Sequence, residues 1–235
     1  MELGLTGKVV MVTGGSRGLG RQIASALGRE GCKISLCARD SKGLEGTVGE
    51  LAAQGYPVHG TQADVTKEED ATRFYHETVA TLGHPDILVN NVGGRRGSVV
   101  FEETTLEQFR QGLEVNLLSA IRLVALVLPH MKVQRWGRII NISSIYGREY
   151  GGSIDYMTAK AGLIGFSKHL ALQLAPYNVL VNCVAPGSID FPGGSWDRFQ
   201  KNNTPEVVAE FIARNLPMGR FGWPEPIGEM VAFLA

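Results

Sequence analysis

The chain has 235 residues, of which 44% are hydrophobic and 20% are charged, and its 23 basic side chains balance 23 acidic ones. This length and composition can bury one full core, so we expect a single domain over residues 1–235. The zero formal charge and the interspersed acids and bases offer no basic face to nucleic acid and no polybasic tract to a membrane.

The sequence indicates neither a targeting signal nor a metal site. The start, Met1–Gly4, lacks the charged-then-apolar pattern of a signal peptide, and the apolar runs look too short and interrupted to span a bilayer. We therefore expect a cytoplasmic protein that binds no membrane. Cys32, Cys37 and Cys183 have no CxxC spacing and the histidines are scattered singly, which predicts buried, reduced thiols and no metal ligands.

Short β-branched runs alternate with helical patterns along the chain. In chain order the pattern predicts strand Lys8–Val12, helix Gly18–Glu30, strand Lys33–Ala38, helix Leu44–Gln54, strand Pro57–Ala63, helix Glu68–Leu82, strand Ile87–Asn90, helix Leu106–Met131, strand Arg138–Ile142, helix Tyr156–Leu174 and strand Val179–Ala185. The strands are mostly apolar without alternation, as in parallel strands covered on both faces. We therefore expect an α/β fold, a doubly wound parallel β-sheet of Rossmann type with helices on both faces.

Residues 188–215 fit this rhythm poorly. The segment Ser188–Asn215 follows the last predicted strand and is rich in Gly, Pro and Asn, with Phe191, Trp196 and Phe199 among its side chains. An insertion at this place predicts a substrate lid whose aromatic side chains close over an apolar or ring-containing substrate. The same aromatic side chains could instead form a small core.

The first predicted strand runs into Thr13-Gly14-Gly15-Ser16-Arg17-Gly18-Leu19-Gly20 and then into a helix. Strand, glycine-rich turn and helix in this order form the context of a dinucleotide pyrophosphate site. Gly14 permits the tight turn, Gly18 lets the backbone approach the phosphates, and Gly20 allows the helix to pack closely. Free N–H groups at the helix start attract the anion.

The end of the second strand bears on the choice of dinucleotide. An acidic residue here would bind the ribose 2′-hydroxyl of NAD, and a basic residue would bind the 2′-phosphate of NADP. The chain has Arg39, and Arg17 in the glycine-rich loop adds a second forked donor. NADP(H) is therefore favoured, although Asp40 would favour NAD(H) if it pointed at the ribose.

Tyr156 and Lys160 stand four residues apart on one face of a predicted helix. A tyrosine with a pKa near 10 is a poor acid or base at neutral pH unless a cation stabilises its phenolate. Lys160 would be that cation. The pair therefore predicts acid–base chemistry, and a solvated helix pair is the plain alternative.

Other polar clusters follow the ends of predicted strands. Ser143-Ser144 ends one strand and Asn90-Asn91-Val92-Gly93 ends another. Ligands of open α/β sheets bind outside the carboxyl ends of the strands. The residues expected to share one cleft are the glycine-rich loop, Arg39, Asp64, Asn90, Ser144, Tyr156 and Pro186-Gly187.

With these motifs the chain resembles the short-chain dehydrogenase/reductases of ordinary length, and within them the 3-oxoacyl-carrier-protein reductases. The motifs that carry the resemblance are TGGSRGLG, Asp64-Val65, NNVG, Asn116, Arg138–Ser144, YMTAK and Val181–Gly187. The family normally continues beyond the position of Ala235 into a seventh strand, so the sequence looks truncated at this end.

The resemblance implies roles for individual residues. Asp64 would contact the adenine, Asn90 would lie beside the adenosine ribose, and Lys160 would hold the nicotinamide ribose and lower the pKa of Tyr156. Ser144, with Ser143 in reserve, would bind the substrate oxygen, and Tyr156 would transfer its proton. Asn116 would hold a water in a proton relay, although it could simply cap or kink its helix, and Asp64 could simply start one. The remaining residues expected at the cofactor are Gly14, Ser16, Arg17, Gly18, Leu19, Gly20, Arg39, Val65, Val92, Gly93, Pro186, Gly187 and Ile189.

These expectations combine into an NADP(H)-dependent oxidoreductase that transfers hydride between the nicotinamide and a small-molecule carbonyl or secondary alcohol. A 3-oxoacyl thioester is one candidate substrate, with Arg135 and Arg138 near the side where its carrier would bind. The alternatives are an NAD-dependent alcohol or polyol dehydrogenase and a non-catalytic dinucleotide-binding regulator. The resemblance also implies a homo-oligomer, either a dimer or a tetramer.

Overall fold

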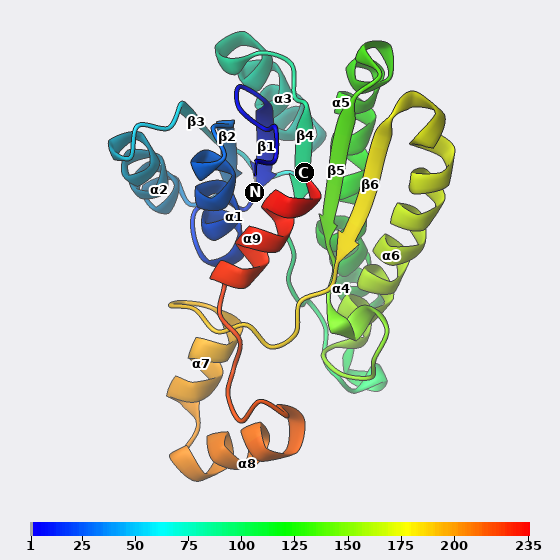
Figure 1. Cartoon of the computed structure of the whole chain (residues 1–235). Helices are drawn as coiled ribbons and strands as arrows, with labels where there is room; N and C mark the ends of the chain where they lie inside the picture. The colour runs from blue at the N-terminus through cyan, green and yellow to red at the C-terminus, as the bar shows by residue number, and fades with distance from the viewer. Residues whose placement is uncertain (1) are drawn as a thin grey trace.

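The computed structural model describes residues 2–235 and contains one parallel sheet (Figure 1). Its six strands lie in the order β3-β2-β1-β4-β5-β6, and every pair of neighbours is parallel. The strands are β1 Val9–Thr13, β2 Lys33–Ala38, β3 Val58–Gln62, β4 Ile87–Asn90, β5 Gly137–Ile142 and β6 Val179–Val184. The order reverses between β1 and β4, which is where ligands bind in open α/β sheets.

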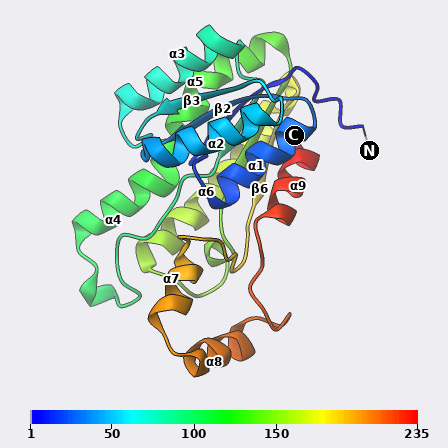
Figure 2. The same cartoon turned by 90° about the vertical axis from the view of Figure 1, so that its left-hand side faces the viewer.

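Helices cover both faces of this sheet. The α-helices are α1 Gly18–Arg29, α2 Ser41–Ala53, α3 Glu68–Leu82, α4 Leu106–Leu113, α5 Ser119–Gln134, α6 Ile154–Leu174, α7 Ser195–Asn202, α8 Pro205–Asn215 and α9 Glu225–Leu234. Helices α1 and α2 lie on one side of the sheet and α3 and α5 on the other (Figure 2). Side chains of α1, α2 and α9 pack in one hydrophobic core, and side chains of α3, α5 and α6 pack in a second. The predicted doubly wound Rossmann-type sheet is therefore confirmed.

The predicted helix Leu106–Met131 is not one regular α-helix. A capping box at Thr105 and Gln108 starts α4, and a π-helical turn, Glu114–Leu118, separates it from α5. Such turns insert an extra residue into the helix and are common at functional sites. Asn116 lies in this turn.

The combined helix Leu106–Gln134 is long and apolar enough, by length and composition, to cross a membrane. This corrects the expectation that every apolar run is too short. Its apolar side chains Leu123, Val127 and Met131 are fully buried in the core that α5 forms with α3 and the sheet. Burial inside the fold identifies it as a core helix.

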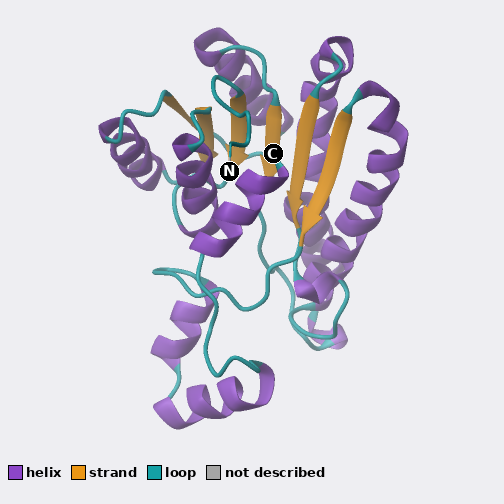
Figure 3. Cartoon of the chain, viewed as in Figure 1, coloured by secondary structure: helices purple, strands orange, loops and turns teal. Residues whose placement is uncertain are grey.

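Three helices after β6 were not predicted. α7 and α8 lie within the expected lid and project beyond the carboxyl ends of the strands (Figure 3). α9 returns to the sheet and packs on α1, where Gly228 lies so close that a Cβ would be 2.8 Å from the Gln22 carbonyl oxygen. Arg29 and Glu229 also form an ion pair between these helices.

The cysteines differ in burial. Cys32 and Cys37 are fully buried, and burial raises the pKa of each thiol to about 12. Cys183 is only partly buried, contrary to expectation. It lies in β6, whose far edge pairs with no strand among residues 2–235.

Candidate active site at the carboxyl edge of the sheet

The glycine-rich loop between β1 and α1 has the backbone conformation that its glycines permit. Gly14 and Gly18 have φ angles of +70° and +54°, in the left-handed region. At Gly20 a Cβ would overlap the Gly14 carbonyl oxygen, so only glycine fits there. No acidic residue occupies the first turn of α1, so no side-chain carboxylate offsets the positive charge of its free N–H groups. These features fit a bound pyrophosphate.

Asn91, which sequence reasoning left without a role, fastens this loop to β4. The Thr13 hydroxyl accepts hydrogen bonds from the N–H groups of Asn91 (2.9 Å) and Val92 (3.0 Å), and Asn91 Nδ2 donates to the Thr13 carbonyl (2.8 Å). The buried side chain of Asn90 points into the sheet and donates to Asn141 Oδ1 on β5 at 2.8 Å. A contact of Asn90 with the adenosine ribose stays a prediction.

Arg39 and Asp64 lie together at the carboxyl ends of β2 and β3. Arg39 is 68% exposed, and its guanidinium is 3.9 Å from Asp64 Oδ2. Asp64 Oδ1 accepts hydrogen bonds from the N–H (3.1 Å) and hydroxyl (2.8 Å) of Thr66, in the turn before α3. Asp64 thus stabilises the turn before α3, whose N-cap is Lys67, and its contact with the adenine stays a prediction. The side chain of Val65, by contrast, is buried in the core.

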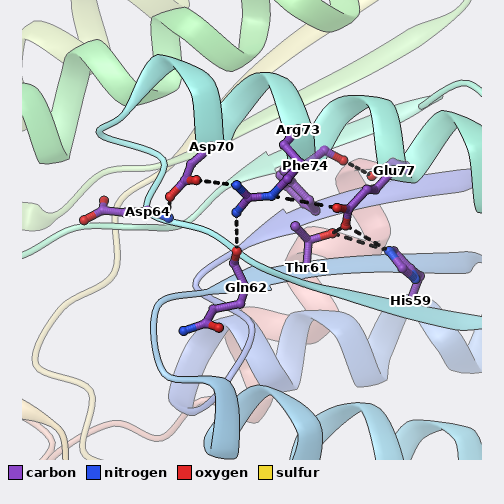
Figure 4. A network of polar contacts seen from close by, with 9 residues as sticks. His59, Thr61, Gln62, Asp64, Asp70, Arg73, Phe74 and Glu77 are labelled. Atoms are coloured by element: carbon purple, nitrogen blue, oxygen red, sulfur yellow. Dashed lines mark hydrogen bonds and ion pairs between the residues drawn. The ribbon is translucent and has the colours of Figure 1, made fainter.

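A polar network holds this turn in place (Figure 4). Asp70 accepts the Asp64 N–H at 2.8 Å, and this bond is the main reason why the pKa of the Asp70 carboxyl lies below its ordinary value. Arg73 pairs with Asp70 at 2.7 Å and donates to the Gln62 carbonyl at 2.6 Å. A shallow depression at this end is lined by Arg39, Gln62, Ala63, Asp64, Asp70 and Arg73.

The Arg17 side chain lies at the segment after β6, and its convergence with Arg39 on a phosphate stays a prediction. An Arg17 guanidinium nitrogen lies 3.1 Å from the position of a Cβ on Gly193, so this side chain reaches toward the expected lid. The ring of Phe191 lies directly on Gly18, where a Cβ would overlap the ring edge. Sequence reasoning did not foresee that this segment lies across the glycine-rich loop.

Ser144 and Tyr156 meet at the end of β5. Ser144 follows the strand and is buried; its hydroxyl accepts the Tyr146 N–H at 3.2 Å, and its proximity lowers the pKa of Tyr156. Ser143 turns the other way and donates to the Lys160 carbonyl at 3.0 Å. This arrangement favours Ser144 over Ser143 as the serine that faces a substrate.

Lys160 is a buried cation behind Tyr156. Its Nζ donates to the Ile142 carbonyl at 2.7 Å and lies 5.6 Å from the centre of the Tyr156 ring. Burial lowers the pKa of Lys160 to about 8. A Cβ on Gly93 would be 3.0 Å from this Nζ, so the glycine of the NNVG motif makes room for the lysine.

The pKa of Tyr156 reflects opposing effects. Burial raises it above the ordinary value, and the nearby Ser144 hydroxyl and the charge of Arg95 oppose this rise only in part. A lowering of this pKa by Lys160 stays a prediction. Its ammonium is directed at the Ile142 carbonyl, and burial weakens its charged form.

Asn116 is fully engaged in backbone hydrogen bonds. Its Oδ1 accepts the Gly94 N–H at 2.9 Å, and its Nδ2 donates to the carbonyls of Gly94 and Gly112, both at 2.8 Å. The side chain therefore joins the π-helical turn to the segment after β4. Its expected function in a water relay stays a prediction.

The Pro186–Ile189 segment closes the edge beside β5. The Pro186 carbonyl accepts the Ile145 N–H at 3.1 Å, and Ile189 forms a parallel bridge with Gly222. The exposed Gly187 lies between them. Arg135 and Arg138, expected near a carrier-binding side, lie at the amino end of β5, opposite to Ser144.

A glycine-rich loop at the switch point, with a serine, tyrosine, lysine and asparagine at the same sheet edge, is the arrangement of a dinucleotide-dependent oxidoreductase. The family model described as "short chain dehydrogenase" matches residues 8–202. The chain therefore belongs to the short-chain dehydrogenase family, and it is an enzyme.

Similar proteins agree with this assignment. The chain is 38% identical to "3-oxoacyl-acyl-carrier-protein reductase FabG" of Aquifex aeolicus (strain VF5), over 100% of this chain and 92% of that protein. It is also 38% identical to "L-fucose dehydrogenase" of Rattus norvegicus, over 98% and 83%. A solved structure of a single-residue variant of the actinorhodin polyketide ketoreductase with NADPH superposes with a TM-score of 0.90 at 34% identity, covering 97% of this chain and 89% of that one.

Proposed function

We propose that the protein is an NADP(H)-dependent oxidoreductase that interconverts a carbonyl compound and a secondary alcohol, with Tyr156 as the general acid and base. The observation that carries this proposal is that Ser144 follows β5 and Tyr156 lies in the first turn of α6 at the same carboxyl edge of the sheet, with Lys160 Nζ 5.6 Å from the centre of the Tyr156 ring. When bound, the nicotinamide supplies or accepts the hydride.

The protein residues would manage the charge on the substrate oxygen. Hydride addition to a carbonyl carbon places negative charge on its oxygen, and preplaced donors stabilise that charge. Ser144 would donate a hydrogen bond, and Tyr156 would transfer its phenolic proton. Burial raises the pKa of Tyr156, so the phenol holds its proton at neutral pH, and the nearby cations Lys160 and Arg95 would have to stabilise the phenolate that forms when this proton is transferred.

The cofactor would lie from Arg39 to Lys160 along the carboxyl edge. The N–H groups of Gly18 and its neighbours would bind the pyrophosphate, and Lys160 would hold the nicotinamide ribose. Arg39 is exposed and only weakly paired, so it is available to a 2′-phosphate. The carboxylate of Asp40 lies over the first turn of α2, 2.5 Å from the position of a Cβ on Gly43. The N-terminus of α2 stabilises a negative charge at this place without a ribose partner.

The relatives support a carbonyl substrate but differ in its class. The FabG and ketoreductase names indicate 3-oxoacyl and polyketide carbonyls, and the L-fucose dehydrogenase name indicates a sugar. A second candidate is thus an NAD-dependent alcohol or polyol dehydrogenase. Asp40, next to Arg39 at the ribose end, is the residue that would favour it.

The first test is a fluorescence titration with NADPH and NADH, followed by turnover of a carbonyl panel. Tighter binding of NADPH is expected, and tighter binding of NADH would favour the second candidate. The Tyr156→Phe variant should lose turnover by a factor of about 100 or more while its NADPH affinity stays within about twofold. Turnover that survives this substitution would contradict the assignment of Tyr156.

We also propose a cytoplasmic homo-oligomer, a dimer or a tetramer, and a substrate lid over residues 188–215. Light scattering of the purified protein would give its oligomeric state. A monomer at micromolar concentration would contradict the proposed homo-oligomer.

A further inference from the structure

The segment that follows β4 is held against the catalytic elements at two points. Asn116 binds both the N–H (2.9 Å) and the carbonyl (2.8 Å) of Gly94. Asp155 accepts hydrogen bonds from both N–H groups of Arg96–Gly97, at 2.9 and 3.1 Å. Arg95 is the residue between these two attachments, so its backbone has little freedom to move.

The side chain of Asp155 provides the second of these attachments. Its side chain is fully buried in the first turn of α6, directly before Tyr156, and it takes part in no ion pair formed by residues 2–235. A Cβ on Gly112 would overlap one carboxylate oxygen, and a Cβ on Gly97 would be 3.1 Å from the other. A buried carboxylate is unfavourable unless its oxygens are bonded. Here both oxygens hold the loop that carries Arg95.

The two arginines of this loop differ in their contacts. The Arg96 guanidinium folds back and donates to the Arg95 carbonyl at 3.0 Å. Arg95 itself is exposed, and the ion pairs among residues 2–235 do not include it. The loop that carries it lies between Lys160 Nζ, which is 3.0 Å from the position of a Cβ on Gly93, and Asp155, the residue directly before Tyr156. The charge of Arg95 also lowers the pKa of Tyr156, so Arg95 is a cation at the end of the site where the substrate oxygen would bind.

We propose that Arg95 binds an anionic group of the substrate, and that Asp155 and Asn116 are positioning residues for it. A guanidinium suits a carboxylate or a phosphate, since its forked donors match two oxygens of either group. The substrate class is then an anionic carbonyl or hydroxy compound. The inference rests on the proposed function, because it takes the oxygen bound by Ser144 and Tyr156 as the reacting one.

The test compares substrates that differ only in charge. Oxo acids of increasing chain length are paired with their primary amides, and dihydroxyacetone phosphate is paired with dihydroxyacetone, all with NADPH. The preference is the ratio of kcat/KM for the anionic member to kcat/KM for the neutral member. Wild-type protein should prefer the anion by about tenfold or more in one series, which also shows whether a carboxylate or a phosphate is recognised.

The Arg95→Gln variant should lose that preference by about tenfold, mainly through KM. An effect of Arg95 on Tyr156 chemistry would change both members alike and cancel in the ratio. Arg110→Gln is the matched control, because it removes the same charge from α4, where Arg110 pairs with Glu107 at 3.9 Å. The control should keep the wild-type ratio.

A second variant tests the attachment. In Asp155→Asn an amide N–H would face a backbone N–H, so the loop should shift and the preference for the anion should fall while the melting temperature reports on folding. A folded Asp155→Asn protein with the wild-type preference would overturn the positioning role. Equal kcat/KM for anion and amide in wild type, or an unchanged ratio in Arg95→Gln, would overturn the inference. Failure of the proposed function would give a different result, because then neither the anionic nor the neutral carbonyl compounds would be reduced with NADPH.

Discussion

At the scale of one residue, the buried ammonium of Lys160 lowers the stability of the folded protein. Its side chain is 2% exposed, and its Nζ has a backbone carbonyl as hydrogen-bond partner where a carboxylate would have neutralised its charge. Burial of a cation without a counter-ion destabilises the folded protein. The lowered pKa of Lys160 expresses that same unfavourable free energy.

Lys160→Met should therefore abolish turnover and stabilise the protein at pH 7. A pKa lowered from 10.5 to about 8 corresponds to roughly 3 kcal/mol, and loss of the bond to the Ile142 carbonyl costs roughly 1 kcal/mol. The free energy of unfolding should rise by about 2 kcal/mol, measured by urea denaturation.

The pH dependence of this difference is a sharper check. Between about pH 8 and pH 10.5 the unfolded wild-type chain binds the Lys160 proton more strongly than the folded protein does. Wild type therefore gains stability from this group as the pH rises through that window, and the advantage of Lys160→Met should shrink. Tyr156 and the buried thiols titrate in both proteins, so their contributions largely cancel. A difference that stays constant from pH 7 to pH 10 would contradict the assignment.

Residue patterns predicted only part of the site. Ser144, Tyr156 and Lys160 could be found because their spacing and their place after strands are visible in the sequence. Asp155 and Asn91 could not, since a single acid or amide has no pattern of its own and acts here through backbone groups distant in sequence. The pKa of Tyr156 also depends on burial, which only the fold determines.

At the scale of elements, the strands and long helices were predictable and the helices after β6 were not. An apolar run between glycines indicates a buried strand wherever it lies, and all six predicted strands are present within one or two residues of their predicted ends. α9 is short and follows a Gly- and Pro-containing stretch, and its place is determined by contact with α1. Its position is a tertiary property that local patterns do not encode.

Alanine substitutions at two glycines should change stability in opposite directions, because only one of them lies at the contact between α9 and α1. Gly228→Ala places a Cβ 2.8 Å from the Gln22 carbonyl oxygen, so α9 must move and stability should fall by about 1–3 kcal/mol. Gly46→Ala lies within α2 with open space around it and should stabilise by about 0.5–1 kcal/mol. Thermal unfolding followed by circular dichroism measures both. A stabilising Gly228→Ala would mean that α9 does not pack closely on α1.

At the scale of the whole molecule, the segment after β6 combines two contacts with different consequences. Phe191 lies on Gly18 of the glycine-rich loop. Farther along, Trp196 packs against Phe199, Phe211 and Phe221, with ring centres 5.8, 4.9 and 5.3 Å away. Trp196 thus joins α7 to α8 in a small aromatic core, the alternative that the sequence had left open. One end of the segment contacts the glycine-rich loop, and the other end holds α7 and α8 together.

Two substitutions should separate these ends. Trp196→Ala removes the centre of the aromatic core, so α7 and α8 should loosen, and KM for the carbonyl substrate should rise about tenfold while the NADPH affinity changes little. Phe191→Ala should show the reverse, a weaker NADPH affinity with a smaller change in KM, because its ring lies on the loop that binds the pyrophosphate. Limited proteolysis should cut Trp196→Ala first between α7 and α8, with the sheet intact. If Trp196→Ala is cut there and yet keeps both constants, the segment closes over no substrate, and substrate selection falls to rigid groups at the sheet edge such as Arg95.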